Sequence, residues 1–157
     1  MSLDAPTPMP VSGADFRIGI AAARFNRNLV DALVNSAWAT LSAAGVAPGS
    51  VETVRVPGSH EIPWAAQQLA ASGRFDAVIT LGVLIAGDTN HHEMVGDAVA
   101  SALMRVSLDT QVPVINGVIV VNNLAQAEAR TTGKINRGAE FAHAALEMAA
   151  LKKSLSK

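Results

Sequence analysis

The segment from Phe75 to Ile85 constrains the fold most, because it is apolar on both faces of an extended strand. Such a strand is stable only if both faces are covered, as in the centre of a parallel sheet. Thr80 breaks its longest apolar stretch, which is far shorter than the roughly 20 residues of a membrane-spanning helix. The segment therefore predicts a sheet with helices on both sides and no membrane span.

Other strands and helices alternate along the chain around this segment. We predict strands at 16–23, 51–56 and 112–121, and helices at 29–41, 61–71, 89–109, 123–130 and 136–151. Gly45 marks a helix end, and Ser59 is expected to cap the helix that follows the break at Pro57-Gly58. This alternation favours an α/β fold with a parallel sheet.

The composition predicts a domain that associates with copies of itself. The 157 residues are 50% hydrophobic and only 16% charged, below the roughly 25% usual for soluble domains. That balance excludes a disordered chain and favours buried self-contact. A net charge of −1 offers nucleic acid no basic field, and the absence of cysteine excludes disulfides and thiolate chemistry. We expect a cytoplasmic, self-associating globular protein.

The first 15 residues differ from the rest of the chain. Pro6, Pro8 and Pro10 predict that 1–15 form an extended arm without a core of its own. The arm has no signal-peptide pattern. Residues 16–157 contain no repeat and no low-complexity tract, so we expect a single domain there.

Ligands of such folds bind beyond the carboxyl ends of the strands. Four segments are expected there: 23–26, 57–61, 85–92 and 116–123. Gly87, Asp88 and Thr89 lie between a strand and a helix start, where backbone N–H groups and the helix dipole favour an anion. Asp88 or Thr89 could equally cap the helix, and the two interpretations are compatible.

Adjacent histidines begin the next helix. The face of this helix expected to point inward contains Met94, Val95, Ala98, Val99, Ala102, Leu103 and Val106. His91 shares that face and is predicted to lean toward the pocket, where it can move protons near neutral pH, while His92 lies about 100° further round. His60 and His143 are weaker candidates. Adjacent helical positions point apart, so no metal site is expected.

Two further features leave alternatives open. Arg130, Lys134 and Arg137 form either a solvated basic turn or a guanidinium site for phosphate. Phe25, at the end of the first strand, either stacks on a flat heterocycle or belongs to the core.

In this order, the segments resemble the lumazine synthase family, whose members are 6,7-dimethyl-8-ribityllumazine synthases. The matching residues lie within about 16–151 and comprise Arg24-Phe25-Asn26, Val56 to Pro63, Leu81 to His91, Val112 to Gly117, Gln126-Ala127 with Arg130, and Ala144 to Ala149. Each piece is weak alone, but the ordered set is specific. The resemblance implies a flavodoxin-like three-layer sandwich whose four-stranded parallel sheet has the order 2-1-3-4.

The resemblance also implies a cofactor-free transferase of riboflavin biosynthesis. It would condense 5-amino-6-ribitylaminouracil with 3,4-dihydroxy-2-butanone 4-phosphate, releasing phosphate and water, with His91 as the proton carrier. The implied substrate-binding residues are Phe25, Asn26, Ser59, His60, Glu61, Val83, Leu84, Ile85, Asp88, Thr89, Asn116 and Arg130. The implied phosphate contacts are Gly87, Asp88, Thr89 and Arg130. Within these sets Phe25 would stack on the pyrimidine, Ser59 and Glu61 would meet the ribityl chain, and Arg130 would come from a neighbouring subunit.

The chain departs from the family pattern at several points. His60 stands where an aromatic or apolar residue is frequent, Asn116 where many members have an aromatic, and Ala86 where a basic residue is common. The connection from Arg130 to Gly138 is one residue short and lacks the usual Gly-Asn pattern. A more polar pocket implies weaker stacking, altered affinity or a changed ligand.

Three other functions remain as alternatives. An archaeal-type riboflavin synthase shares the fold, but it needs no phosphate site of the kind that residues 87–91 suggest. A non-catalytic flavin- or lumazine-binding assembly protein would fit the altered pocket. A flavodoxin-like mononucleotide binder would need a Ser-, Thr- and Gly-rich loop after the first strand, and residues 21–26 do not provide one.

The resemblance further implies a homopentamer with sites at the subunit interfaces. Some relatives close twelve pentamers into a 60-subunit shell. Prolines lack the N–H that a sheet ladder needs, so the arm is a poor strand to add to a neighbour. Together with the shortened connection after Arg130, this favours the pentamer over the shell.

Overall fold

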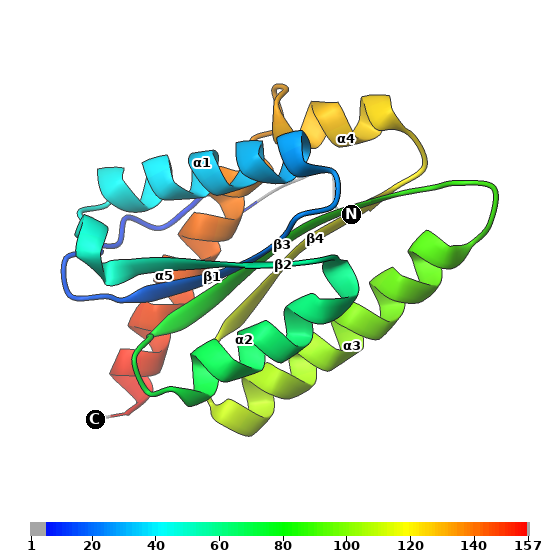
Figure 1. The fold of residues 1–157 in the computed structure, drawn as a ribbon. Coiled ribbons are helices and arrows are strands. Elements are labelled where there is room, and N and C mark those ends of the chain that lie inside the picture. Colours follow the sequence, from blue (N-terminus) through cyan, green and yellow to red (C-terminus); the bar gives the residue numbers. More distant parts are fainter. Residues whose placement is uncertain (1–5, 157) are drawn as a thin grey trace.

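The computed structural model describes residues 6–156, which form a three-layer α/β sandwich (Figure 1). Its sheet contains four parallel strands in the order β2-β1-β3-β4. The strands are β1 (Ile18–Ala23), β2 (Val51–Val56), β3 (Ala77–Ile85) and β4 (Val114–Val121). The predicted fold class and strand order are confirmed, and the segment that is apolar on both faces is an inner strand.

Helices cover both faces of the sheet. They are α1 (Arg27–Ala43), α2 (Ile62–Ala71), α3 (His91–Thr110), α4 (Leu124–Thr131) and α5 (Arg137–Leu155), and two 3₁₀ turns are η1 (Pro48–Ser50) and η2 (Ser59–Glu61). Figure 1 shows α1, α4 and α5 on one face and α2 with α3 on the other. No helix within residues 6–156 is long and apolar enough to cross a membrane.

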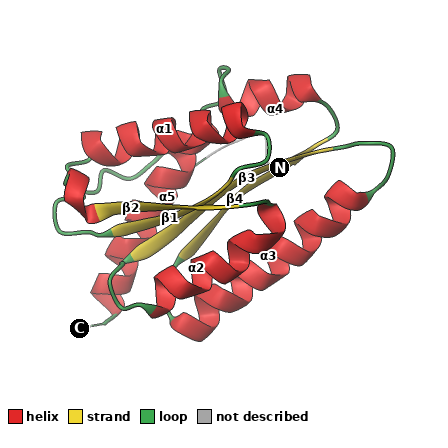
Figure 2. Cartoon of the chain, viewed as in Figure 1, coloured by secondary structure: helices red, strands yellow, loops and turns green. Residues whose placement is uncertain are grey.

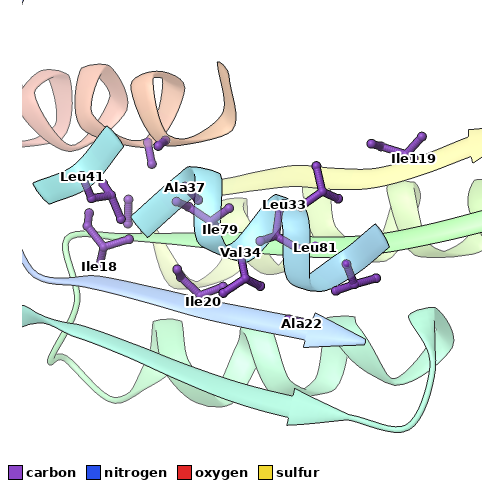
Figure 3. Close-up of a cluster of buried hydrophobic side chains, with 14 of the residues drawn as sticks. Ile18, Ile20, Ala22, Leu33, Val34, Ala37, Leu41, Ile79, Leu81 and Ile119 are labelled. Atoms are coloured by element: carbon purple, nitrogen blue, oxygen red, sulfur yellow. The ribbon is translucent and has the colours of Figure 1, made fainter. Parts of the chain in front are cut away.

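Each face of the sheet has its own buried apolar cluster. The larger cluster lies between β1, β3 and the helices α1 and α5, and Figure 3 shows its centre. The labelled side chains there are Ile18, Ile20, Ala22, Leu33, Val34, Ala37, Leu41, Ile79, Leu81 and Ile119. The smaller cluster lies under α2 and α3. Because both clusters are anchored on β1 and β3, the ends of these strands are rigid points for a site.

Thr80, the polar interruption of the central strand, is fully buried. Its Oγ1 donates to the carbonyl oxygen of Ile115 at 2.8 Å and lies 3.4 Å from the backbone nitrogen of Gly117. A buried hydroxyl with a partner costs little. Thr80 therefore ties β3 to β4 and does not weaken the core.

Of two local predictions about helix ends, one is confirmed and one is wrong. Gly45 has φ of 92°, so the helix before it ends where the sequence predicts. The predicted cap at Ser59 is wrong, because its hydroxyl has no hydrogen-bond partner. Instead, the Glu61 Oε2 accepts from the Gly58 N–H at 2.8 Å. That contact forms because the chain makes the 3₁₀ turn η2 before α2 begins.

The described part of the arm, residues 6–15, contains no helix or strand. It is held by the Met9 N–H, which donates to Glu147 Oε1 at 2.8 Å, and by the Gly13 N–H, which donates to the Ala44 carbonyl at 2.7 Å. Residues 1–5 of the predicted arm lie outside the described residues. The division into an arm and one domain stays a prediction.

Candidate active site

A cavity of about 470 Å³ lies at the carboxyl ends of β1 and β3. Figure 2 shows the loops after these strands leaving at the same end of the sheet. The lining residues are Phe25, Asn26, Gly58, Ser59, His60, Glu61, Val83, Leu84, Ile85, Gly87, Thr89, His91, His92 and Val95. Most of the residues expected at the site therefore meet in one place, as expected for parallel strands.

The β1–α1 turn presents Phe25 to this cavity. Asn26 takes the left-handed conformation, with φ of 51° and ψ of 44°, and its Nδ2 donates to the Val83 carbonyl at 2.9 Å. Asparagine tolerates that conformation better than most residues. Phe25 is 71% exposed and lies against Gly58, where an added Cβ would be 3.4 Å from the ring. Phe25 is therefore not a core residue, and its ring is available for stacking.

The η2 turn supplies two polar side chains to the same cavity. His60 and Glu61 have side chains that are 71% and 49% exposed, and the His60 Nδ1 lies 4.0 Å from Glu61 Oε1. Since Oε2 of Glu61 holds the Gly58 N–H, Oε1 is the carboxylate oxygen left for a ligand. Ser59 is buried beside them.

The face of α3 that is predicted to point inward is buried only in part. Met94 is 62% exposed and Ala98 is also exposed, so the face that carries His91 is not the buried one. The buried face holds Val95 and Val99, and His92 lies on it, one turn before Val95. The buried residues of the helix are Val95, Val99, Leu103 and Val106, so its buried face is narrower than predicted. His91 is exposed and lines the cavity from the first residue of α3, next to the preceding loop.

The loop of the predicted anion site, Gly87 to Thr89, is exposed. Asn90 is the residue before α3, and its side chain makes no capping hydrogen bond. The His91 N–H donates to Thr89 Oγ1 at 3.4 Å, a weak contact, and Asp88 does not line the cavity. Capping by Asp88 is therefore wrong. An added Cβ at Gly87 would meet nothing within 4 Å, so the backbone there is open to a ligand.

Arg130 and Asn116 lie elsewhere in the same chain. With Arg137 and Phe141, they line a separate cavity of about 350 Å³ beside β4. The Arg130 Nη1 donates to the Gln126 carbonyl at 2.8 Å, and Arg137 pairs with Glu140. Lys134 does not line this cavity. The single chain thus separates the basic residues from the histidines.

His92 and Gly58 are cavity residues that the sequence did not single out as binding residues. The helical pattern places His91 on the face expected to point inward and His92 about 100° further round, so it predicts no binding role for His92. The ring nitrogens of His92 are buried because α3 packs closely on β4: an added Cβ at Gly96 would lie 2.7 Å from Val120 Cγ2. Within residues 6–156, no group of three or more acidic or histidine side chains could hold a metal ion.

The order of strands and the cavity at their carboxyl ends define a flavodoxin-like α/β protein with a small-molecule site. Residues 15–153 match the family model described as 6,7-dimethyl-8-ribityllumazine synthase. The chain belongs to that family, and the resemblance is confirmed.

Curated relatives agree over most of the chain. A 6,7-dimethyl-8-ribityllumazine synthase of Stenotrophomonas maltophilia (strain K279a) is 46% identical over 140 residues, which cover 88% of this chain and 90% of the relative. The protein of that name from Polaromonas sp. (strain JS666 / ATCC BAA-500) is 43% identical over 141 residues, 90% of each chain. The one from Xanthomonas campestris pv. campestris (strain B100) is 47% identical over 133 residues, 84% of this chain and 86% of the relative. These relatives do not favour the riboflavin synthase alternative.

Proposed function

We propose that this chain is a transferase that condenses 5-amino-6-ribitylaminouracil with 3,4-dihydroxy-2-butanone 4-phosphate to 6,7-dimethyl-8-ribityllumazine. The observation that carries the proposal is the cavity in which Phe25, the η2 turn, the end of β3 and His91 meet. Membership of the lumazine synthase family supports the same reaction.

The proposed chemistry needs proton transfers but no cofactor or metal. The pyrimidine amine attacks the ketone to form an imine and water, phosphate leaves, and the second amine closes the ring with loss of water. His91 donates and accepts the protons of these steps, for which its exposed position beside the cavity is suitable. Holding two small molecules together removes much of the entropic barrier.

The proposed binding roles follow the walls of the cavity. Phe25 stacks on the pyrimidine, Asn26 fixes the turn that presents it, and Val83 to Ile85 offer backbone groups to the heterocycle. Ser59, His60 and Glu61 face the ribityl chain. At the loop before α3, Gly87, Asp88 and Thr89 bind phosphate through backbone N–H groups, because the Asp88 carboxylate itself would repel an anion.

We propose that a neighbouring subunit completes the phosphate site with Arg130 and closes the pocket with Asn116. Their separation from the main cavity within one chain supports this arrangement. Exposed apolar side chains offer a contact surface for other copies: Met94, Met104, Leu108, Val120 and Leu124. A closed ring of five chains of 16.2 kDa would have a mass of about 80 kDa.

Light scattering at micromolar protein concentration tests the assembly. A mass near 80 kDa supports the pentamer, and a particle near about one megadalton would favour the 60-subunit shell. A monomer would contradict the shared site. The cytoplasmic location stays a prediction.

The reaction is tested by incubating the protein with both substrates and following lumazine absorbance and phosphate release together. Stoichiometric release of phosphate with lumazine is expected. Binding of lumazine without turnover would instead support the non-catalytic assembly protein.

A further inference from the structure

The main cavity contains polar atoms that its known contacts leave unsatisfied. Across residues 6–156, the buried side-chain nitrogen and oxygen atoms without a hydrogen-bond partner are Ser59 Oγ, His92 Nδ1 and His92 Nε2. Both residues line the same cavity. Buried polar groups are nearly always paired, so orphan atoms concentrated at one site need an explanation.

The surroundings of these side chains do not supply a partner. Ser59 Oγ points at Gly82, where an added Cβ would lie only 2.6 Å away. His92 lies on the helix face of Val95 and Gly96, which packs on apolar side chains, Val120 among them. All three orphan atoms are already closed to solvent within one chain.

A turn of the His92 ring toward the cavity would break no hydrogen bond, because neither ring nitrogen makes one. The reverse is true of Asn26 and Glu61, whose side chains already hold backbone groups. His92 can therefore take a ligand as its partner without giving up a hydrogen bond, whereas Asn26 and Glu61 cannot.

The chemistry of the orphan groups selects the kind of ligand. A serine hydroxyl both donates and accepts, and a neutral imidazole has one donor and one acceptor. Phosphate oxygens and carbonyl groups only accept, so they would leave half of these groups unpaired. A chain of hydroxyl groups donates and accepts at every position. The side chain of the pyrimidine substrate offers several such hydroxyl groups in a row and fits best, whereas the butanone phosphate has only its C3 hydroxyl, between a carbonyl and a phosphate group.

We infer that His92 is a specificity-determining residue that turns into the cavity and, with Ser59, hydrogen-bonds the polyol chain of the pyrimidine substrate. The inference rests on the proposed function for the identity of that substrate. It adds His92 to the binding residues and leaves proton transfer to His91.

The variant His92→Phe tests the inference, because phenylalanine fills similar space and removes both nitrogens. We expect the KM for the pyrimidine to rise about 3- to 10-fold, as for one or two neutral hydrogen bonds. The KM for the butanone phosphate and kcat should stay within about twofold of wild type. The melting temperature should rise by about 2–4 °C, because the variant no longer buries unpaired polar atoms.

Two comparisons make the result specific. His143→Phe changes a partly buried histidine on α5, outside the main cavity, and should alter neither KM. A pyrimidine analogue without side-chain hydroxyls should bind wild type and His92→Phe equally. His92→Gln, which keeps a donor and an acceptor, should retain more affinity than the phenylalanine variant and serves if that variant does not fold.

An unchanged pyrimidine KM in His92→Phe, or equal increases for both substrates, would overturn the inference. Calorimetric binding of 5-amino-6-ribitylaminouracil separates this failure from failure of the proposed function. A wild-type protein that binds the pyrimidine more tightly than His92→Phe but forms no lumazine would refute the reaction and keep the role of His92. A wild-type protein that does not bind the pyrimidine would refute both.

Discussion

Two cavities of the chain differ in what they contain. The cavity beside β1 and β3 holds Phe25, the η2 turn and both α3 histidines. The cavity beside the edge strand β4 holds Arg130, Arg137 and Asn116. The first has groups for ring binding and proton transfer, and the second has positive charge. Neither has both.

This division teaches how a chain of low charge can serve an anionic substrate. The cavity that holds the histidines has no arginine or lysine among its lining residues. In the second cavity Arg130 is held by a backbone carbonyl and Arg137 by Glu140, at the sheet edge where another copy can approach. Assembly would bring positively charged side chains of one subunit to the histidine-lined cavity of another, so the complete site would exist only in the oligomer.

The largest effect is expected in the first cavity. His91→Ala should lower kcat by about 10- to 1,000-fold while the fold survives, because an exposed general acid–base group is lost and solvent replaces it only in part. Steady-state turnover at saturating substrates measures the effect, and circular dichroism controls for folding. Unchanged turnover would remove His91 from the chemistry.

A smaller and more selective effect is expected in the second cavity. Arg130→Ala should raise the KM for the butanone phosphate by about 10- to 150-fold, which corresponds to a charge-assisted hydrogen bond of about 1.5–3 kcal/mol. The KM for the pyrimidine should change little. Lys134→Ala is the matched control, because Lys134 is a nearby cation that does not line this cavity. Equal changes for both substrates would place Arg130 outside the phosphate site.

Mixing the two variants tests whether one site uses both cavities. In randomly mixed oligomers of His91→Ala and Arg130→Ala chains, about a quarter of the sites would receive an intact half from each chain. At butanone phosphate concentrations well below the raised KM of Arg130→Ala, where sites without Arg130 contribute little, we expect about a quarter of wild-type activity. His91→Ala mixed with the double variant forms no intact site and should stay inactive. No recovery in the first mixture would show that each chain works alone.

Much of the fold follows from local patterns in the sequence. Short apolar runs and helical periodicity predict all four strands and all five helices, with ends that differ by a few residues. Gly45 and the Pro57-Gly58 pair act locally, through backbone conformation, so their positions can be read without tertiary contacts. Three of the four site segments are predictable for a related reason, since loops at the carboxyl ends of parallel strands lie at the same edge of the sheet, but no residue of 116–123 lines the main cavity.

The exact environment of each side chain depends on packing between distant segments. The predicted inward face of α3 is confirmed for Val95, Val99, Leu103 and Val106 but wrong for Met94, which is exposed, while the ring nitrogens of His92 are buried. Ser59 fails as a cap because the η2 turn lets Glu61 take the Gly58 N–H. A periodic pattern admits several rotations that differ by one residue, and contacts across the sheet select one of them.

The sequence by itself determined the alternation of elements, the order of the segments that mark the family, and the end of the sheet that carries the site. Only the tertiary structure decided which histidine is buried, which polar atoms stay unpaired, and that Arg130 lies in a cavity apart from His91. The physical reason is one of range: backbone preferences and hydrophobic periodicity act over a few neighbours, whereas burial and pairing depend on residues far apart in the chain.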